Sequence, residues 1–272
     1  MSLFTGRPIM SNEQEKHIVL IHGTWGNAGN WDELRPALEA IGFTVHTPTL
    51  RHHELGFLEC ALEIGSVSLR DYVDDLVTYI EELDHSPIIA GLSMGGLLCQ
   101  LVAARCKHRG VVCFSPAPAW GMFNLYPSMV RTFHYYTNQW AFWRKPLYPS
   151  WEEFRWGVVN EQTEEKAREY FLACVPESGK AYFEMGFWYF DRNRSSYVDV
   201  DSIQSPVLVF VGQKDRVVAP RIGRLTAKRY GNKATLVELP DADHCMVIGE
   251  QLENVMPEFE RWVENNKIYL AD

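Results

Sequence analysis

The chain contains a serine whose surroundings suit nucleophilic catalysis. Ser93 stands in the pattern G-L-S-M-G (residues 91–95), directly after the short apolar run Ile88–Leu92. A strand that turns sharply into a helix presents such a serine at its tip, and glycines two residues away on either side allow strand and helix to pass closely. A serine hydroxyl is a poor nucleophile at neutral pH, so the chain must also supply a base.

The candidate base is His244, the only one of nine histidines beyond residue 134. It follows the last predicted core strand, residues 235–239. A carboxylate that orients the imidazole should precede it, in the chain order Ser, Asp, His. Asp215 fits this position because it follows the apolar run Val207–Val211. The carboxyl ends of parallel strands are where open α/β sheets gather their sites. Ser93, Asp215 and His244 are therefore the predicted catalytic residues.

Other aspartates could orient the histidine, and they fit less well. Asp241 and Asp243 are so close in sequence to His244 that reaching Nδ1 with the right geometry is harder. Asp199 and Asp201 belong to the end of a segment of different composition. These four remain competitors of the preferred aspartate.

The surrounding sequence alternates short apolar runs with segments of helical periodicity. Strands are predicted over 17–22, 43–48, 88–92, 111–114, 207–211 and 235–239, and helices over 31–41, 68–83, 94–106, 222–230 and 255–263. Ser68 and Asp71 form a capping box at the start of one of these helices. This order predicts an α/β fold in which a mostly parallel sheet is flanked by helices.

The alternation breaks between residues 118 and 204, a stretch that holds 22 of the 35 aromatic residues. Residues 161–175 and 179–190 have helical character. We expect a core made of residues 1–117 and 205–272, with residues 118–204 inserted as an aromatic-rich helical cap.

Charge and composition exclude several classes of protein. The formal net charge of −9 argues against a nucleic-acid partner, because affinity for a phosphate backbone depends on basic charge. No apolar stretch approaches the ~20 residues that cross a bilayer, and residues 1–12 do not resemble a signal peptide, so we expect a cytoplasmic protein without a membrane span. The six cysteines form no C-x-x-C pair, which argues against disulfides and structural zinc.

The chain resembles the α/β-hydrolase family, in particular small serine carboxylesterases and monoacylglycerol lipases. The resemblance covers residues 16–116 and 205–265 and rests on H-G-T-W (residues 22–25), the Ser93 pattern, Asp215 and His244. It implies that the backbone N–H groups of Thr24 and Met94 form an oxyanion hole, that His22 holds the surrounding loop, and that no cofactor is needed.

Two departures from the family pattern stand out. Few residues precede the first strand, so the antiparallel strands that open many members should be shortened or absent. R-H-H-E (residues 51–54) stands where many members have R-G-H-G. We interpret His52 and His53 as a solvated loop rather than a metal pair, because a third ligand is missing, and no metal site is predicted.

A serine nucleophile argues against epoxide opening and halide removal, because family members with those activities use aspartate at the position of Ser93. We expect hydrolysis of a small to medium apolar carboxylic ester through an acyl-enzyme. Trp25, Trp120 and Phe123 are predicted to contact the substrate. The same residues would also serve a thioesterase, a lactonase or a carbon–carbon bond hydrolase, or a ligand-binding receptor with vestigial turnover. No oligomeric state is predicted.

Overall fold

In the computed structural model, which describes residues 15–269, the main sheet has six parallel strands in the order β2-β1-β3-β4-β7-β8. The strands are β1 (Lys16–Ile21), β2 (Phe43–His46), β3 (Ile88–Leu92), β4 (Gly110–Phe114), β7 (Val207–Gly212) and β8 (Ala234–Leu239). The predicted α/β fold is confirmed. The predictions about the chain before the first strand, including residues 1–12, lie outside the described residues.

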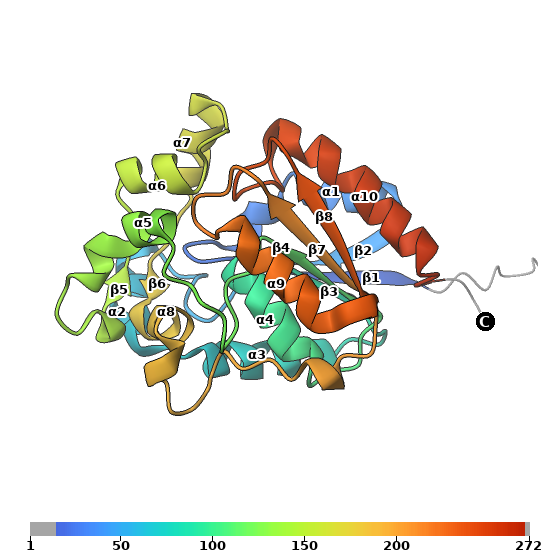
Figure 1. Cartoon of the computed structure of the whole chain (residues 1–272), viewed down its shortest axis with the longest axis horizontal. Helices are drawn as coiled ribbons and strands as arrows, with labels where there is room; N and C mark the ends of the chain where they lie inside the picture. The colour runs from blue at the N-terminus through green and yellow to red at the C-terminus, as the bar shows by residue number, and fades with distance from the viewer. Residues whose placement is uncertain (1–14, 270–272) are drawn as a thin grey trace, which may run out of the picture.

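Helices cover both faces of this sheet (Figure 1). The core helices are α1 (Leu34–Ala40), α3 (Leu69–Glu81), α4 (Met94–Ala103), α9 (Pro220–Tyr230) and α10 (Leu252–Asn265). Helices α1 and α10 lie on one face, and α3, α4 and α9 lie on the other. Every residue of α4 is buried, since the helix lies between the sheet and its neighbours. This central helix fixes the position of the residue that precedes it, Ser93.

Helix α3 begins at the capping box that the sequence predicts. The Ser68 side chain accepts a hydrogen bond from the first turn, and the Asp71 carboxylate accepts the backbone N–H of Ser68 at 2.8 Å. Leu69, Val73 and Leu76 are among the residues buried on its apolar face. Short helices complete the core: η1 (Ala28–Trp31), α2 (Phe57–Glu63), η2 (Ile64–Ser66), η6 (Gly231–Lys233) and η7 (Gly249–Gln251).

Residues 118–204, which we call the insertion, join β4 to β7 and lie at one end of the molecule (Figure 1). Its elements are α5 (Pro127–Thr137), η3 (Phe142–Arg144), β5 (Pro146–Leu147), α6 (Trp151–Gly157), α7 (Glu164–Leu172), β6 (Glu177–Ser178), α8 (Gly179–Gly186), η4 (Trp188–Phe190) and η5 (Val200–Ser202). Both predicted helices are present as α7 and α8. The antiparallel pairing of β5 with β6 has no counterpart in the prediction.

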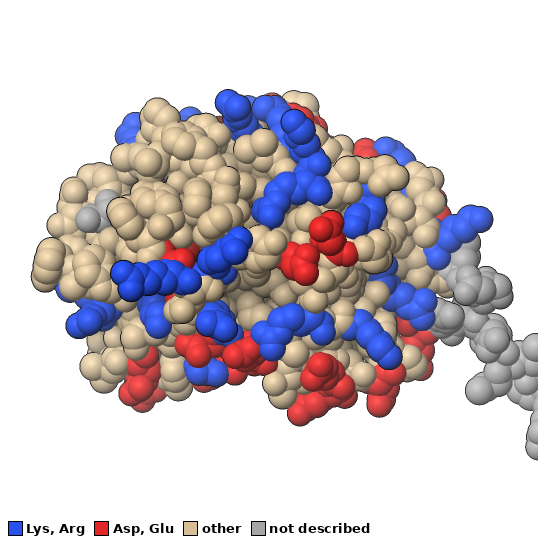
Figure 2. Space-filling view, turned by 60° about the horizontal axis from the view of Figure 1, so that its bottom comes forward, with Lys and Arg blue, Asp and Glu red and all other residues tan. Residues whose placement is uncertain are grey.

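Part of the surface of the insertion carries few charged side chains. Figure 2 shows few Lys, Arg, Asp or Glu side chains over the upper part of the end where Figure 1 places the insertion. Its exposed apolar side chains include Phe123, Trp140 and Phe190. Among residues 15–269, no helix is both long enough and apolar enough to cross a membrane.

Candidate active site

Ser93 occupies a sharp turn between β3 and α4. Its backbone angles, φ 58° and ψ −118°, lie in a region that a residue with a side chain rarely adopts, so the turn is strained. Glycine is required on both sides of it. A Cβ on Gly95 would lie 2.0 Å from the carbonyl oxygen of Ile21, and one on Gly91 would lie 2.1 Å from that of Gly95. The close pass of β3, α4 and β1 therefore depends on these two glycines.

Asp215 and His244 are brought together from loops that follow β7 and β8. The Nδ1 atom of His244 lies 2.8 Å from Oδ2 of Asp215, and both residues are buried. The other carboxylate oxygen accepts the backbone N–H groups of Val217 and Val218, each at 2.8 Å. These bonds hold the carboxylate, which in turn makes Nδ1 the protonated nitrogen of a neutral ring and leaves Nε2 as an acceptor.

The competing aspartates are engaged elsewhere. Asp243 accepts the backbone N–H groups of Glu161 at 2.9 Å and Cys245 at 3.0 Å. Burial raises the pKa of the Asp243 carboxyl. The side chain of Asp241 is 88% exposed and pairs with a lysine. Asp199 accepts a serine hydroxyl, and Asp201 is exposed. Of the carboxylates weighed for this role, the structure places that of Asp215 against the imidazole.

The loop after β1 runs past the serine. A Cβ on Gly23 would lie 3.0 Å from the Cβ of Ser93, so the two backbones approach closely here. Thr24 follows directly, and Met94 is the first residue of α4. Within residues 15–269 no hydrogen bond is donated by the N–H of Thr24 or of Met94. Both of the predicted oxyanion donors are therefore free to bind an anionic oxygen.

His22 holds this loop through two hydrogen bonds to backbone groups. Its Nε2 accepts the backbone N–H of Leu50 at 3.0 Å, so Nδ1 carries the proton and donates to the carbonyl oxygen of Gly23, also at 3.0 Å. Burial, followed by the nearby charge of His53, lowers the pKa of His22 to about 3. The imidazole is consequently a neutral ring with one defined tautomer.

Two cavities meet at Ser93. The larger has a volume of about 190 Å³, and the smaller, about 40 Å³, also reaches His244. Thr24, Ser93, Phe133 and Val217 line both. Apolar side chains of the insertion dominate the wall of the larger cavity: Leu125, Met129, Val130, Phe133, Met185 and Phe187. Asn124, whose amide donates to the carbonyl oxygens of Met185 and Gly186, is a lining residue that the sequence did not reveal.

The three aromatic residues predicted to contact substrate occupy different places. Trp25 is buried, lines the smaller cavity and donates its indole N–H to the carbonyl oxygen of Leu147 at 3.1 Å. Trp120 is not among the residues that line either cavity and packs instead against Trp188. Phe123 is 61% exposed and also lies outside both cavities. Only Trp25 is brought to the site.

The interpretation of residues 51–54 as a solvated loop is wrong for His53. Its side chain is buried, with Nε2 at 3.3 Å from Oε2 of Glu177. The described side chains that could share a metal ion are instead Glu15, His17 and His85, whose candidate ligand atoms lie within 4.8 Å of one another. This group is near the start of β1, whereas Ser93 follows the end of β3, so it takes no part in the chemistry of the serine.

The fold and the site together place the chain in a known family. The alpha/beta hydrolase family profile matches residues 18–255, and the chain belongs to this family. A comparison with curated proteins found no match. The family assignment confirms the resemblance drawn from the Ser93, Asp215 and His244 motifs.

Solved structures with the same fold include several hydrolases. A pyrethroid hydrolase from Sphingobium faniae is 19% identical, with a TM-score of 0.70 over 94% of this chain and 100% of the other. A methylesterase from Arabidopsis is 17% identical, with a TM-score of 0.69 over 92% and 99%. An extracellular α/β-hydrolase from a Paenibacillus species is 22% identical, with a TM-score of 0.68 over 92% and 99%. At these identities the likeness establishes the fold.

Proposed function

We propose that the protein is a serine hydrolase that cleaves carboxylic esters with small to medium apolar groups through an acyl-enzyme on Ser93. One observation carries this proposal: a serine on a strained turn lines the same cavity as a histidine that a buried aspartate holds by Nδ1. This combination supplies both a nucleophile and a base of defined orientation. The esterase chemistry of the structurally similar methylesterase agrees with the proposal.

In the proposed reaction, His244 Nε2 takes the hydroxyl proton as Ser93 Oγ attacks the ester carbonyl carbon. The negative charge that develops on the carbonyl oxygen is bound by the N–H groups of Thr24 and Met94. His244 then gives the proton to the leaving alkoxide, the alcohol departs and an acyl-enzyme remains. Water attacks this ester with His244 again acting as base, which releases the acid and restores Ser93. Asp215 stabilises the imidazolium formed in each half of the reaction.

The two cavities favour a substrate with groups on both sides of its ester bond. An apolar cavity of ~150 Å³ in another protein holds one benzene ring, so the larger cavity suits a short or medium acyl chain or a single ring. The smaller cavity would take a compact group on the other side of the serine. We further propose that the insertion acts as a cap domain, because it supplies most of the wall of the larger cavity.

The proposal is tested with p-nitrophenyl esters from acetyl to dodecanoyl, a matched thioester and a lactone. We expect kcat/KM to rise with chain length by roughly fourfold per methylene, at ~0.8 kcal/mol each, and then to level off when the cavity is full. Higher kcat/KM for the thioester or lactone would move the assignment to those substrates. Binding of these compounds without turnover would contradict a hydrolase and indicate a ligand-binding receptor.

A further inference from the structure

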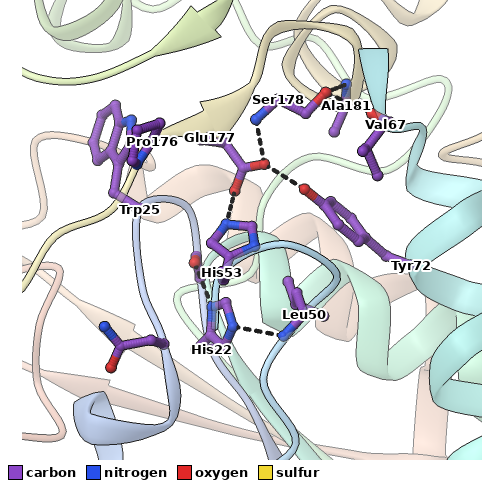
Figure 3. Close-up of polar contacts among 12 residues, drawn as sticks. His22, Trp25, Leu50, His53, Val67, Tyr72, Pro176, Glu177, Ser178 and Ala181 are labelled. Atoms are coloured by element: carbon purple, nitrogen blue, oxygen red, sulfur yellow. Dashed lines mark hydrogen bonds and ion pairs between the residues drawn. The ribbon is translucent and has the colours of Figure 1, made fainter. Parts of the chain in front are cut away.

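A buried carboxylate of the insertion belongs to a hydrogen-bonded network that reaches the loop beside Ser93 (Figure 3). Glu177 in β6 is fully buried. Its Oε1 accepts the hydroxyl of Tyr72 at 2.8 Å and the backbone N–H of Ser178 at 2.6 Å. Its Oε2 lies 3.3 Å from Nε2 of His53. Two core segments, α3 and the loop that contains His53, are thus joined to the insertion through one side chain.

Each ring nitrogen of His53 has an oxygen partner. Nδ1 lies 3.3 Å from the carbonyl oxygen of Arg51, and Nε2 lies 3.3 Å from Glu177. These two contacts couple the His53 ring both to the backbone of its own loop and to the buried carboxylate of the insertion. His22 is the next ring, with its centroid 5.0 Å from that of His53. The two rings meet edge to face, so the position of the His53 ring bears directly on that of His22.

The bonds continue from His53 to the peptide group that carries the Thr24 N–H. The backbone N–H of His53 donates to the carbonyl oxygen of Leu50 at 2.9 Å, which closes the turn, and the N–H of Leu50 donates to His22. His22 in turn donates to the carbonyl oxygen of Gly23. In a planar trans peptide the C=O and N–H point in opposite directions. Holding the Gly23 oxygen therefore sets the direction of the Thr24 N–H.

The insertion also holds the next residue of this loop. The backbone N–H of Val175 donates to the carbonyl oxygen of Trp25 at 2.9 Å, and the amide of Asn27 donates to the carbonyl oxygen of Ala173 at 3.0 Å. Trp25 itself has a left-handed backbone, φ 64°, a strained conformation that needs such support. Residues 173–177 of the insertion therefore act on both sides of Thr24.

We propose that Glu177 and His53 are positioning residues that orient the Thr24 N–H toward the oxyanion. Through these two residues the insertion contributes to the catalytic site. This rests on the function proposed for Ser93. Neither residue touches the substrate. Glu177 fixes the His53 ring, the turn closed by His53 presents the Leu50 N–H to His22, and His22 holds the Gly23–Thr24 peptide in place.

The test compares Glu177→Gln with Glu184→Gln. Glu184 is a matched control: it is buried in α8 and accepts hydrogen bonds from Ser68 and Leu69, but it makes no bond to the Thr24 loop. In Glu177→Gln we expect kcat to fall about tenfold with KM changed less than twofold, a smaller loss than the ~10²–10³-fold for deleting an oxyanion donor. Glu184→Gln should retain the kcat of the parent protein.

Imidazole ¹⁵N spectra separate positioning from a merely structural role. The parent protein should show a neutral His22 protonated at Nδ1. Glu177→Gln should shift the ring signals of His53 and the Nδ1–H signal of His22, whereas Glu184→Gln should preserve both. If Glu177→Gln does not fold, His53→Gln takes its place with the same expected kcat loss and His22 shift.

An unchanged His22 signal in the test variant, or an equal loss of kcat in Glu184→Gln, would overturn the positioning role. The spectra require no substrate, so they test the positioning role of Glu177 and His53 even if no ester is hydrolysed. Failure of ester hydrolysis in the parent protein would count against the proposed function alone.

Discussion

The Asp215 carboxylate and the His244 imidazole meet through a 2.8 Å contact between Oδ2 and Nδ1 in a buried setting. The two residues are 29 positions apart and follow neighbouring parallel strands, β7 and β8. The base and the group that orients it therefore lie, like Ser93, at the carboxyl ends of the parallel strands.

Asp215→Asn should lower kcat by about 10³–10⁴-fold, because an amide cannot stabilise the imidazolium and favours the wrong tautomer. Asp243→Asn is the matched control, since it changes a neighbouring buried aspartate that binds backbone N–H groups instead of the imidazole. We expect it to retain kcat within tenfold. Steady-state kinetics of the two purified variants make the comparison, and a larger loss in Asp243→Asn would show that the acid is misassigned.

Phe133→Ala should change acyl selectivity, because this side chain lines both cavities and its removal joins them. We expect the optimum chain to lengthen, with a loss of stability of about 3 kcal/mol for the deleted buried ring. Phe123→Ala, which alters an exposed ring outside the cavities, should leave the optimum unchanged. The kcat/KM profile over the ester series measures both effects. A change of the optimum chain length in Phe123→Ala alone would indicate that Phe123, and not Phe133, contacts the substrate.

His22 should make the fold more stable as pH rises from 3 to 6.5. Its pKa is about 3 in the folded protein, against 6.5 for an unperturbed histidine in the unfolded chain, so over this window the unfolded chain binds more protons. Acidification from pH 6.5 to 5 should cost about 2 kcal/mol through this group.

Urea unfolding at several pH values, in the parent protein and in His22→Gln, measures this contribution. His46 and His108, whose pKa values are also lowered by burial, contribute to both proteins and cancel in the difference. Parallel stability curves for the two proteins would mean that His22 is not held neutral.

Gly95→Ala should destabilise the fold by more than about 4 kcal/mol, since the new Cβ would lie 2.0 Å from the backbone oxygen of Ile21 in β1. Gly56→Ala is the control: its Cβ would meet nothing closer than 4.0 Å, and a cost of about 1 kcal/mol or less is expected. Thermal unfolding measures both. Equal melting temperatures would show that the turn at Ser93 can relax.

The fold and the catalytic candidates are predictable because their signals are local. The glycines around Ser93, the capping box at Ser68 and the strand–helix alternation each lie within a few residues of sequence. Chain order then relates Asp215 to His244. The helix predicted over residues 31–41 divides into η1 and α1, and the strand predicted over 43–48 ends at His46. These are differences in boundaries that leave the site unchanged.

Contacts between distant segments carry no such signal. His53 and Glu177 are 124 positions apart, and nothing near either residue reveals the other. The same holds for the short strands β5 and β6, which pair only because the insertion folds back on itself. Aromatic content identifies the insertion, but it does not distinguish Phe133, which lines the cavities, from Trp120, which packs on Trp188. The residues that line the cavities are therefore the part of the site that the sequence alone does not predict.

Reaction with a fluorophosphonate probe, followed by mass spectrometry of the digested protein, tests the activated serine most directly. We predict one adduct, on the peptide that contains Ser93. We also predict no adduct in Ser93→Ala and much slower labelling in His244→Ala, with circular dichroism confirming that both variants fold. Labelling of Ser93→Ala at the rate of the parent protein, or an unlabelled Ser93 in a parent protein that hydrolyses esters, would contradict the role of Ser93 as the nucleophile.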